Sequence, residues 1–174
     1  MSQEYFFQWV LTRCHTAPEQ GQGHRSMKKP KQTLALFYCQ NTPESTEKDR
    51  QALEEEYGGR LRLFPLPCGG RLEPLHLLRA LEEFADAVYV ITCPEGVCRY
   101  FEGNLRAIKR AEVAARSVSG IGLEKERVGI VVNSKDQLKS LAGLTAEIME
   151  RIKPLSASPV LSTLKRKGNI LAAF

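Results

Sequence analysis

Short apolar runs alternate along the chain with longer segments in which apolar residues recur at helical spacing. Four runs have the length and composition of buried strands: residues 33–39, 60–66, 86–92 and 127–133. The segments that follow them are amphipathic and predict helices over residues 45–57, 73–84, 104–118 and about 135–153. Strands that alternate with helices form a parallel sheet with helices packed on both faces. The pattern therefore predicts an α/β fold.

The length of 174 residues suits one domain with its own core. We expect an extension over residues 1–31 with one short helix near residues 5–12, a domain over residues 32–155 and a basic tail over residues 156–174. No apolar run approaches the roughly 18 to 20 residues that span a bilayer. Acidic Glu4 precedes the first apolar residues and no small-residue cleavage site follows them, which argues against a secretory signal. We therefore expect a cytoplasmic protein without a membrane span.

The net charge of +5 could indicate nucleic-acid binding, but Lys and Arg are spread along the chain with Glu between them. Dense basic runs occur only near the ends, at residues 28–31 and 165–167. These runs are either solvated tails or contacts for an acidic protein partner. We expect no nucleic-acid partner.

Four of the five cysteines follow predicted strands. Cys39 ends the first strand, Cys68 follows the second, Cys93 follows the third, and Cys98 lies in the next loop. The carboxyl ends of neighbouring parallel strands share one edge of a sheet, so these thiols are expected to converge. A Cys₄ site of this kind suits a [2Fe–2S] cluster, a [4Fe–4S] cluster or structural zinc. Glycines that let backbone amides approach sulfur flank the cysteines: Gly69, Gly70, Gly96 and Gly103.

Other interpretations of these cysteines remain open. A buried lone cysteine is often a small core residue, and Cys₄ zinc would make the protein a non-redox binding or scaffold module. A thiol-redox enzyme using Cys93 and Cys98 is a third possibility, although such enzymes place C-x-x-C at a helix start. We expect Cys14, in the extension, to be a free thiol.

Features of an enzyme active site are missing from the sequence. His15, His24 and His76 have no pairing that suggests a catalytic triad, and no glycine-rich phosphate-binding motif follows a strand. An electron-transfer protein needs no catalytic acid or base, so the sequence favours a non-catalytic role of this kind.

Several motifs together resemble a known family. Cys68-Gly-Gly-Arg-Leu-Glu-Pro74 matches a Cys-Ser-Gly-Arg-Val-Asp-Pro pattern, and Thr92-Cys-Pro-Glu-Gly-Val-Cys-Arg-Tyr100 matches a Gly-Cys-His-Pro-Gly-Asp-Cys-His-Tyr loop. Phe84-Ala-Asp86 and Gly103-Asn104 also agree. With Cys39, residues 33–134 resemble the delta subunit of methyl-viologen-reducing hydrogenase.

The resemblance implies a fold, a cofactor and partners. The implied scaffold is flavodoxin-like or Rossmann-like, and the implied cofactor is a [2Fe–2S] cluster. Carried over by position, its ligands are Cys39, Cys68, Cys93 and Cys98. The implied role is an electron relay between a hydrogenase or formate dehydrogenase and a heterodisulfide-reductase-like flavoprotein.

The chain departs from the family at two places. Many members carry further cysteines after the first strand, where this chain reads Tyr38-Cys39-Gln-Asn-Thr42. Without those thiols, only four cysteines remain in the domain. Either these four are the ligands, or the chain binds a cluster differently from other members. Pro94 and Arg99 replace loop histidines. Arg99 either raises the cluster potential or, like Arg71, forms an ion pair with Glu95 or Glu102.

Three further residues of this region carry expectations. Tyr100 and Phe101 either shield the cluster from water or belong to the core, and we expect core residues. We expect Asn104 to cap the following helix rather than to take a redox role.

Overall fold

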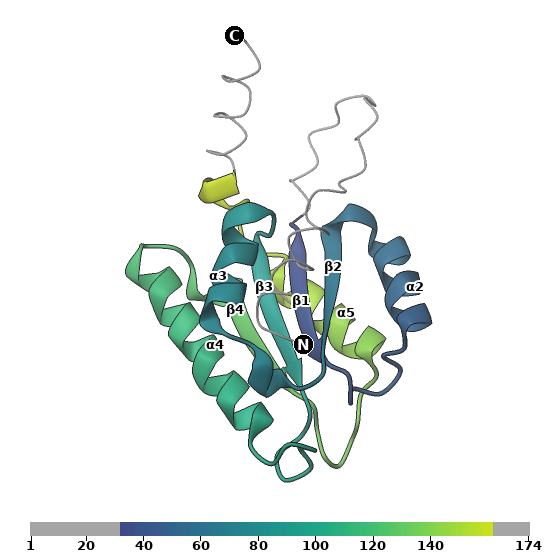
Figure 1. Ribbon diagram of the computed structural model, residues 1–174. Helices are drawn as coiled ribbons and strands as arrows, with labels where there is room; N and C mark the ends of the chain where they lie inside the picture. The colour runs from purple at the N-terminus through teal and green to yellow at the C-terminus, as the bar shows by residue number, and fades with distance from the viewer. Residues whose placement is uncertain (1–31, 162–174) are drawn as a thin grey trace.

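The computed structural model describes residues 32–161, which form one sheet of four parallel strands with helices on both faces (Figure 1). The strands are β1 (Leu34–Cys39), β2 (Leu61–Leu66), β3 (Ala87–Thr92) and β4 (Val128–Val132). The helices are α2 (Glu47–Tyr57), α3 (Pro74–Glu83), α4 (Gly103–Gly120) and α5 (Leu141–Ile152). The predicted α/β fold with a parallel sheet is confirmed.

Strand β1 lies between β2 and β3, and the strand order is β2-β1-β3-β4. Strand β2 is added on one side of β1, whereas β3 and then β4 are added on its other side. The direction in which successive strands are added therefore reverses at β1, and the carboxyl end of β1 marks the reversal point. This order matches the first four strands of the flavodoxin-like arrangement, in which ligands bind at that reversal point.

Successive strand residues point to opposite faces of the sheet, so two apolar layers form. On one face, Leu36 and Tyr38 pack among residues of α2 and α5. On the other face, Ala35 and Phe37 pack among residues of α3 and α4. Full burial of each Leu or Phe side chain contributes about 1.5–3 kcal/mol. The two layers fix the strand ends relative to the helices.

Helix α5 begins later than the helical spacing predicted. The side chain of Asn133 holds the preceding loop, because its amide nitrogen donates to the carbonyl of Lys139 and its oxygen accepts from the Lys139 N–H. The hydroxyl of Ser140 then accepts from the N–H of Gly143 and caps the helix. The predicted start near residue 135 was therefore wrong, because side-chain hydrogen bonds hold residues 133–140 outside the helix.

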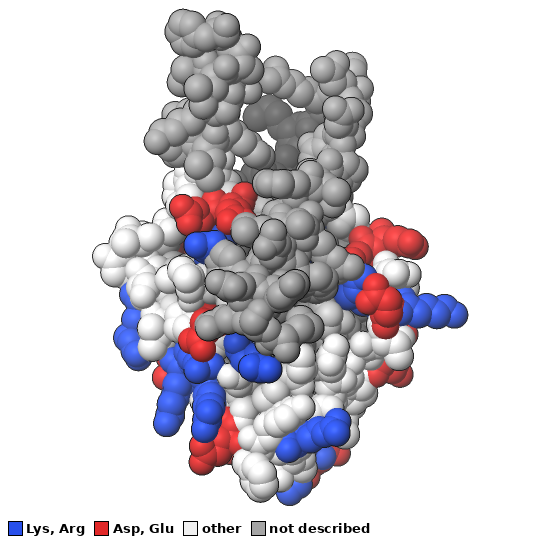
Figure 2. Space-filling view, in the orientation of Figure 1, with Lys and Arg blue, Asp and Glu red and all other residues white. Residues whose placement is uncertain are grey.

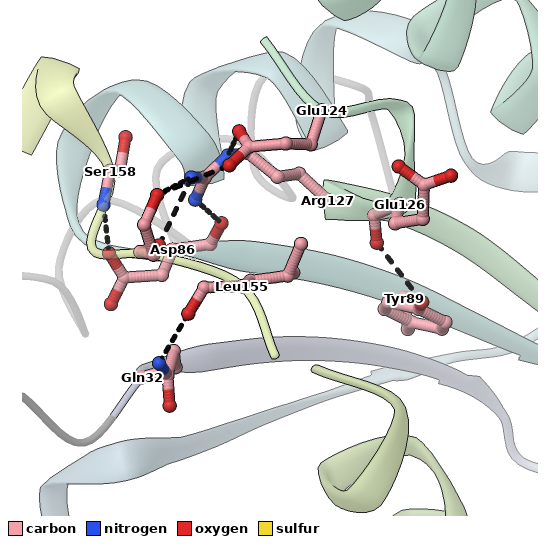
Figure 3. A network of polar contacts seen from close by, with 9 residues as sticks. Gln32, Asp86, Tyr89, Glu124, Glu126, Arg127, Leu155 and Ser158 are labelled. Carbon is pink, nitrogen blue, oxygen red and sulfur yellow. Dashed lines mark hydrogen bonds and ion pairs between the residues drawn. The ribbon is translucent and has the colours of Figure 1, made fainter. Parts of the chain in front are cut away.

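A buried guanidinium connects several segments at the amino edge of the sheet (Figure 3). Arg127 is fully buried and donates to the backbone carbonyls of Asp86 and Ser156 at 2.9 and 3.0 Å. Its Nε lies 2.8 Å from the carboxylate of Glu124. The carboxylate of Asp86 accepts from the N–H of Ser158 at 2.6 Å. These contacts bind the segment after α5 to the starts of β3 and β4.

Some expectations fall on residues outside the described part of the chain. These include the short helix near residues 5–12, Cys14, and the basic runs at residues 28–31 and 165–167. Within residues 32–161, none of the helices has the length and apolar character needed to cross a bilayer.

Candidate metal centre

Three cysteines lie at the carboxyl edge of the sheet, which is the lower edge in Figure 1. Cys39 is the last residue of β1, Cys93 directly follows β3, and Cys68 lies just beyond β2. Because β1 is paired with both β2 and β3, the three strand ends are neighbours. Cys98 is in the loop between β3 and α4. The winding of the sheet thus brings thiols from distant parts of the sequence to the reversal point.

The four thiols interact with one another. Cys39 and Cys98 lie close enough to Cys93 to raise its pKa, and Cys98 and Cys39 likewise raise the pKa of Cys68. The start of α4 lies against two of the sulfurs, since a Cβ atom at Gly103 would be 2.2 Å from the Sγ of Cys68 and 3.1 Å from the Sγ of Cys98. A larger residue at this position would have to displace a sulfur or the start of the helix. The cysteines form a connected group that begins at Cys39 and ends at Cys68.

Burial differs among the thiols and shifts their pKa values. Cys93 is 5% exposed, and its burial, with Cys39 and Cys98 beside it, raises its pKa to about 12. Burial also raises the pKa of Cys68. Burial alone would raise the pKa of Cys98 as well, but the backbone N–H groups of Tyr100, Asn104 and Gly103, together with the Cys93 thiol, outweigh it and lower that pKa. Backbone amides therefore favour a thiolate at the most exposed of the four cysteines.

Helix α4 binds the loop that carries Cys93. The buried side-chain amide of Asn104 donates to the carbonyl oxygens of Cys93 and Pro94 at 3.4 and 3.0 Å. Asn104 was expected to cap the helix. That prediction was wrong, because α4 begins at Gly103 with Glu102 as its N-cap residue. Its position in the first turn lets its side chain hold the loop instead.

Helix α4 also binds the loop that carries Cys68. Arg110 donates to the carbonyl oxygens of Gly70 and Leu72 at 2.6 and 2.9 Å and pairs with Glu73 at 3.0 Å. Within that loop, the N–H of Gly70 donates to the Sγ of Cys68 at 3.4 Å. No local pattern distinguished Arg110 in the sequence, because its partners, two backbone carbonyls and one carboxylate, are far away in the chain.

Two buried hydroxyls near the cysteines have no hydrogen-bond partner. They belong to Thr42 and Thr92 and are the buried side-chain polar atoms left without a partner in the described part of the chain. Thr42 follows Cys39 by a tight turn, in which its N–H donates to the Cys39 carbonyl at 2.9 Å. Thr92 directly precedes Cys93. An unpaired buried hydroxyl costs about 1–3 kcal/mol, so both positions favour a bound acceptor.

The aromatic residues after Cys98 are exposed. Tyr100 is 56% exposed and Phe101 is 90% exposed, so the expectation that they belong to the core was wrong. The loop turns outward at Phe101, whose φ angle of +62° is in the left-handed region. Ion pairing of Arg99 or Arg71 with Glu95 or Glu102 is likewise not found among the described residues. Glu102 instead lies 3.9 Å from Arg106.

Charged side chains around this edge do not gather into one basic patch on the visible face. Figure 2 shows Lys and Arg interspersed with Asp and Glu there, with uncharged residues between them. This mixture agrees with the even spread of charge along the sequence.

Among residues 32–161, no three His, Cys, Asp or Glu side chains are grouped so as to hold a metal ion. His76 is in α3, where its Nδ1 accepts from the N–H of Glu73 at 3.0 Å, and burial lowers its pKa. His15 and His24 are outside the described residues.

The residues nevertheless fit an iron–sulfur group by their chemistry. Four thiols are the donor set that [2Fe–2S] and [4Fe–4S] clusters use. A glycine at position 103 leaves room beside two of the sulfurs, and backbone N–H groups point at Cys98. The unpaired hydroxyls of Thr42 and Thr92 offer further donors to an inorganic sulfide.

Comparison with known proteins identifies relatives with iron–sulfur functions. An iron-sulfur subunit of the F420-non-reducing hydrogenase vhu of Methanopyrus kandleri is 33% identical over 100 residues, which cover 58% of this chain and 76% of that protein. An iron-sulfur subunit of the F420-non-reducing hydrogenase of Archaeoglobus profundus is 32% identical over 104 residues, covering 60% and 76%. These similarities support an electron-transfer role.

A different relative is much longer than this chain. It belongs to the ferredoxin:CoB-CoM heterodisulfide reductase of Methanosarcina mazei and is 29% identical over 111 residues, which cover 64% of this chain but 14% of that protein. The family model described as methyl-viologen-reducing hydrogenase, delta subunit, matches residues 34–156. This match includes all four strands and all four cysteines of the edge, and the chain belongs to that family.

Proposed function

We propose that Cys39, Cys68, Cys93 and Cys98 hold a [2Fe–2S] cluster through which the protein relays electrons. The observation that carries this proposal is the connected group of four thiols at the reversal point of the sheet. A [2Fe–2S] cluster takes four cysteine thiolates, and these four residues would supply them. When bound, the cluster accepts one electron and returns it.

The protein's own residues would shield, tune and expose the cluster. Cys39, Cys68 and Cys93 are each less than 10% exposed, which excludes water from most of the site. The N–H groups directed at Cys98 stabilise negative charge on its sulfur and thereby favour the reduced cluster. Cys98 is partly exposed, so the cluster would approach the surface on this side. Electrons would enter or leave there.

The proposed partners follow from the relatives. The hydrogenase iron-sulfur proteins supply the argument for a hydrogenase as the donor, with a formate dehydrogenase as the alternative donor. The similarity to a short part of two heterodisulfide reductase proteins supplies the argument for a heterodisulfide-reductase-like flavoprotein as the acceptor. The relay would act in the cytoplasm, where cysteine thiols stay reduced.

Substitution of single cysteines tests the ligand set. Each of Cys39→Ser, Cys68→Ser, Cys93→Ser and Cys98→Ser is expected to lower the iron content and visible absorbance of anaerobically purified protein sharply, because a serine oxygen is a poorer ligand for iron in such clusters. Cys14→Ser is the matched control and should change neither. Full retention of iron and absorbance in Cys93→Ser would contradict the proposal.

Electron transfer to the acceptor is tested separately. The reduced, iron-loaded protein is mixed anaerobically with a purified heterodisulfide-reductase-like flavoprotein, and flavin reduction is followed by its absorbance. We expect flavin reduction with the wild-type protein and none with Cys93→Ser. An iron-loaded wild-type protein that reduces no flavin would contradict the acceptor while leaving the cluster assignment intact.

A further inference from the structure

Thr92 is a fully buried threonine whose hydroxyl has no hydrogen-bond partner. Thr145 shows the usual situation, since it is equally buried and its hydroxyl donates to the carbonyl of Leu141 at 2.8 Å. A buried hydroxyl without a partner carries an uncompensated desolvation penalty. A bound hydrogen-bond acceptor near the Thr92 hydroxyl would remove this penalty, and the described protein atoms supply none.

The position of Thr92 on the sheet places it beside the candidate cluster ligands. Tyr38 of β1 pairs with Ile91 of β3, so the next residues of the two parallel strands, Cys39 and Thr92, are neighbours. Both side chains follow the alternation that directs Phe37 and Val90 toward α3 and α4. Cys39 and Thr92 thus lie side by side on the same face of the sheet.

The loop that carries Cys68 packs on the side chain of Thr92. A Cβ atom at Gly69 would lie 3.1 Å from the Cγ2 of Thr92 and 3.4 Å from the Cβ of Ala107 in α4. Thr92 is therefore enclosed between β1, the Cys68 loop and the first turns of α4. Three of the candidate ligands surround it: Cys39 on the adjacent strand, Cys68 next to Gly69, and Cys93 next along the chain.

Building on the proposed function, we infer that the Thr92 hydroxyl would donate an O–H···S hydrogen bond to a sulfur atom of the bound cluster. Sulfur carries more negative charge after the cluster accepts an electron, so a donor at this position favours the reduced state. The proton stays on the Thr92 oxygen in both redox states. The hydroxyl thus raises the reduction potential.

The test is a potentiometric titration of the iron-loaded full-length chain with dithionite, monitored by low-temperature EPR. Thr92→Val keeps the shape of the side chain and removes the hydroxyl, whereas Thr92→Ser keeps the hydroxyl. Thr145→Val removes an equally buried hydroxyl on the opposite face of the sheet and serves as the matched control.

We expect Thr92→Val to disfavour reduction by about threefold to tenfold in the one-electron equilibrium constant, where tenfold corresponds to about 59 mV. Thr92→Ser and Thr145→Val should keep the wild-type potential. Unfolding of the cluster-free protein by urea should also separate the two variants. Thr92→Val should unfold at the same or a higher urea concentration than the wild type, and Thr145→Val at a lower one.

Each outcome decides between specific claims. An iron-loaded Thr92→Val with the wild-type potential overturns the role of the hydroxyl and leaves the proposed function standing. Loss of iron in Thr92→Val but not in Thr92→Ser supports the hydroxyl, and loss in both overturns it. A wild-type protein that takes up no iron overturns the proposed function itself.

Discussion

The guanidinium of Arg110 donates a hydrogen bond of 2.6 Å to the carbonyl oxygen of Gly70, two residues after Cys68 in the chain. The same side chain also donates to the Leu72 carbonyl and pairs with the Glu73 carboxylate, so one residue of α4 holds the Cys68 loop by two backbone carbonyls and one side chain. The distance between Cys68 and the other three cysteines therefore depends on contacts made by a residue outside that group.

Arg110→Ala should loosen this loop. Residues that orient metal ligands typically contribute about tenfold to metal affinity. We expect iron to be lost to a chelator about tenfold faster, with about 1 kcal/mol of lost stability because the guanidinium is partly exposed. Arg106→Ala, one turn earlier on the same helix with an exposed ion pair, is the control. Equal iron loss from both variants would contradict the role of Arg110.

Gly103→Ala should prevent cluster binding. The added methyl group would lie 2.2 Å from the Sγ of Cys68, which forces the sulfur or the helix to move and costs about 1–3 kcal/mol. Gly120→Ala, at the other end of α4, meets no atom within 4 Å and should stabilise the helix by about 0.5–1 kcal/mol. Iron content and thermal unfolding measure both effects. Wild-type iron content in Gly103→Ala would contradict the close packing.

Asn104→Ala should affect the cluster as well as stability. Its side chain donates to the carbonyls of Cys93 and Pro94, and loss of these two buried hydrogen bonds should cost about 1–3 kcal/mol. Asn133→Ala removes an equally buried asparagine that holds the loop before α5. We expect similar destabilisation by urea unfolding in both variants and reduced iron retention in Asn104→Ala alone.

Acid should weaken the network at the amino edge of the sheet. Hydrogen bonding to Arg127 lowers the pKa of Glu124 from 4.5 to about 2. The folded state therefore binds fewer protons than the unfolded state, and this contribution is present above about pH 4.5 and lost as the pH falls toward 2. Because Glu124 is 43% exposed, we expect less than about 1 kcal/mol.

Glu124→Gln provides the measurement. Its urea-unfolding free energy should fall less steeply than that of the wild type between pH 4.5 and 2, because the substituted side chain does not titrate. Parallel curves for the two proteins over this range would show that the ion pair does not contribute.

The strand ends that carry Cys39 and Cys93 could be predicted from the sequence, because buried strands of a parallel sheet are continuous apolar runs. The neighbouring positions of Cys39 and Thr92 could not, because they depend on the order and register of strands far apart in the chain. The spacing of residues along the sequence contains no information about strand order or strand register.

Two errors in the loop between β3 and α4 have a common cause. Tyr100 and Phe101 were expected in the core, but the loop turns outward at Phe101. Asn104 suited a helix cap, but the helix starts one residue earlier and its amide binds the loop of Cys93. In both cases the path of the loop between β3 and α4 decides the outcome, and residue type alone does not determine that path.

The most direct measurement is low-temperature EPR of the anaerobically purified, dithionite-reduced protein, with iron, sulfide and zinc quantified in the same sample. We expect about two iron and two sulfide per chain, a red-brown colour and a reduced-cluster signal that disappears in Cys93→Ser. A colourless protein with stoichiometric zinc and no EPR signal would contradict the iron–sulfur assignment.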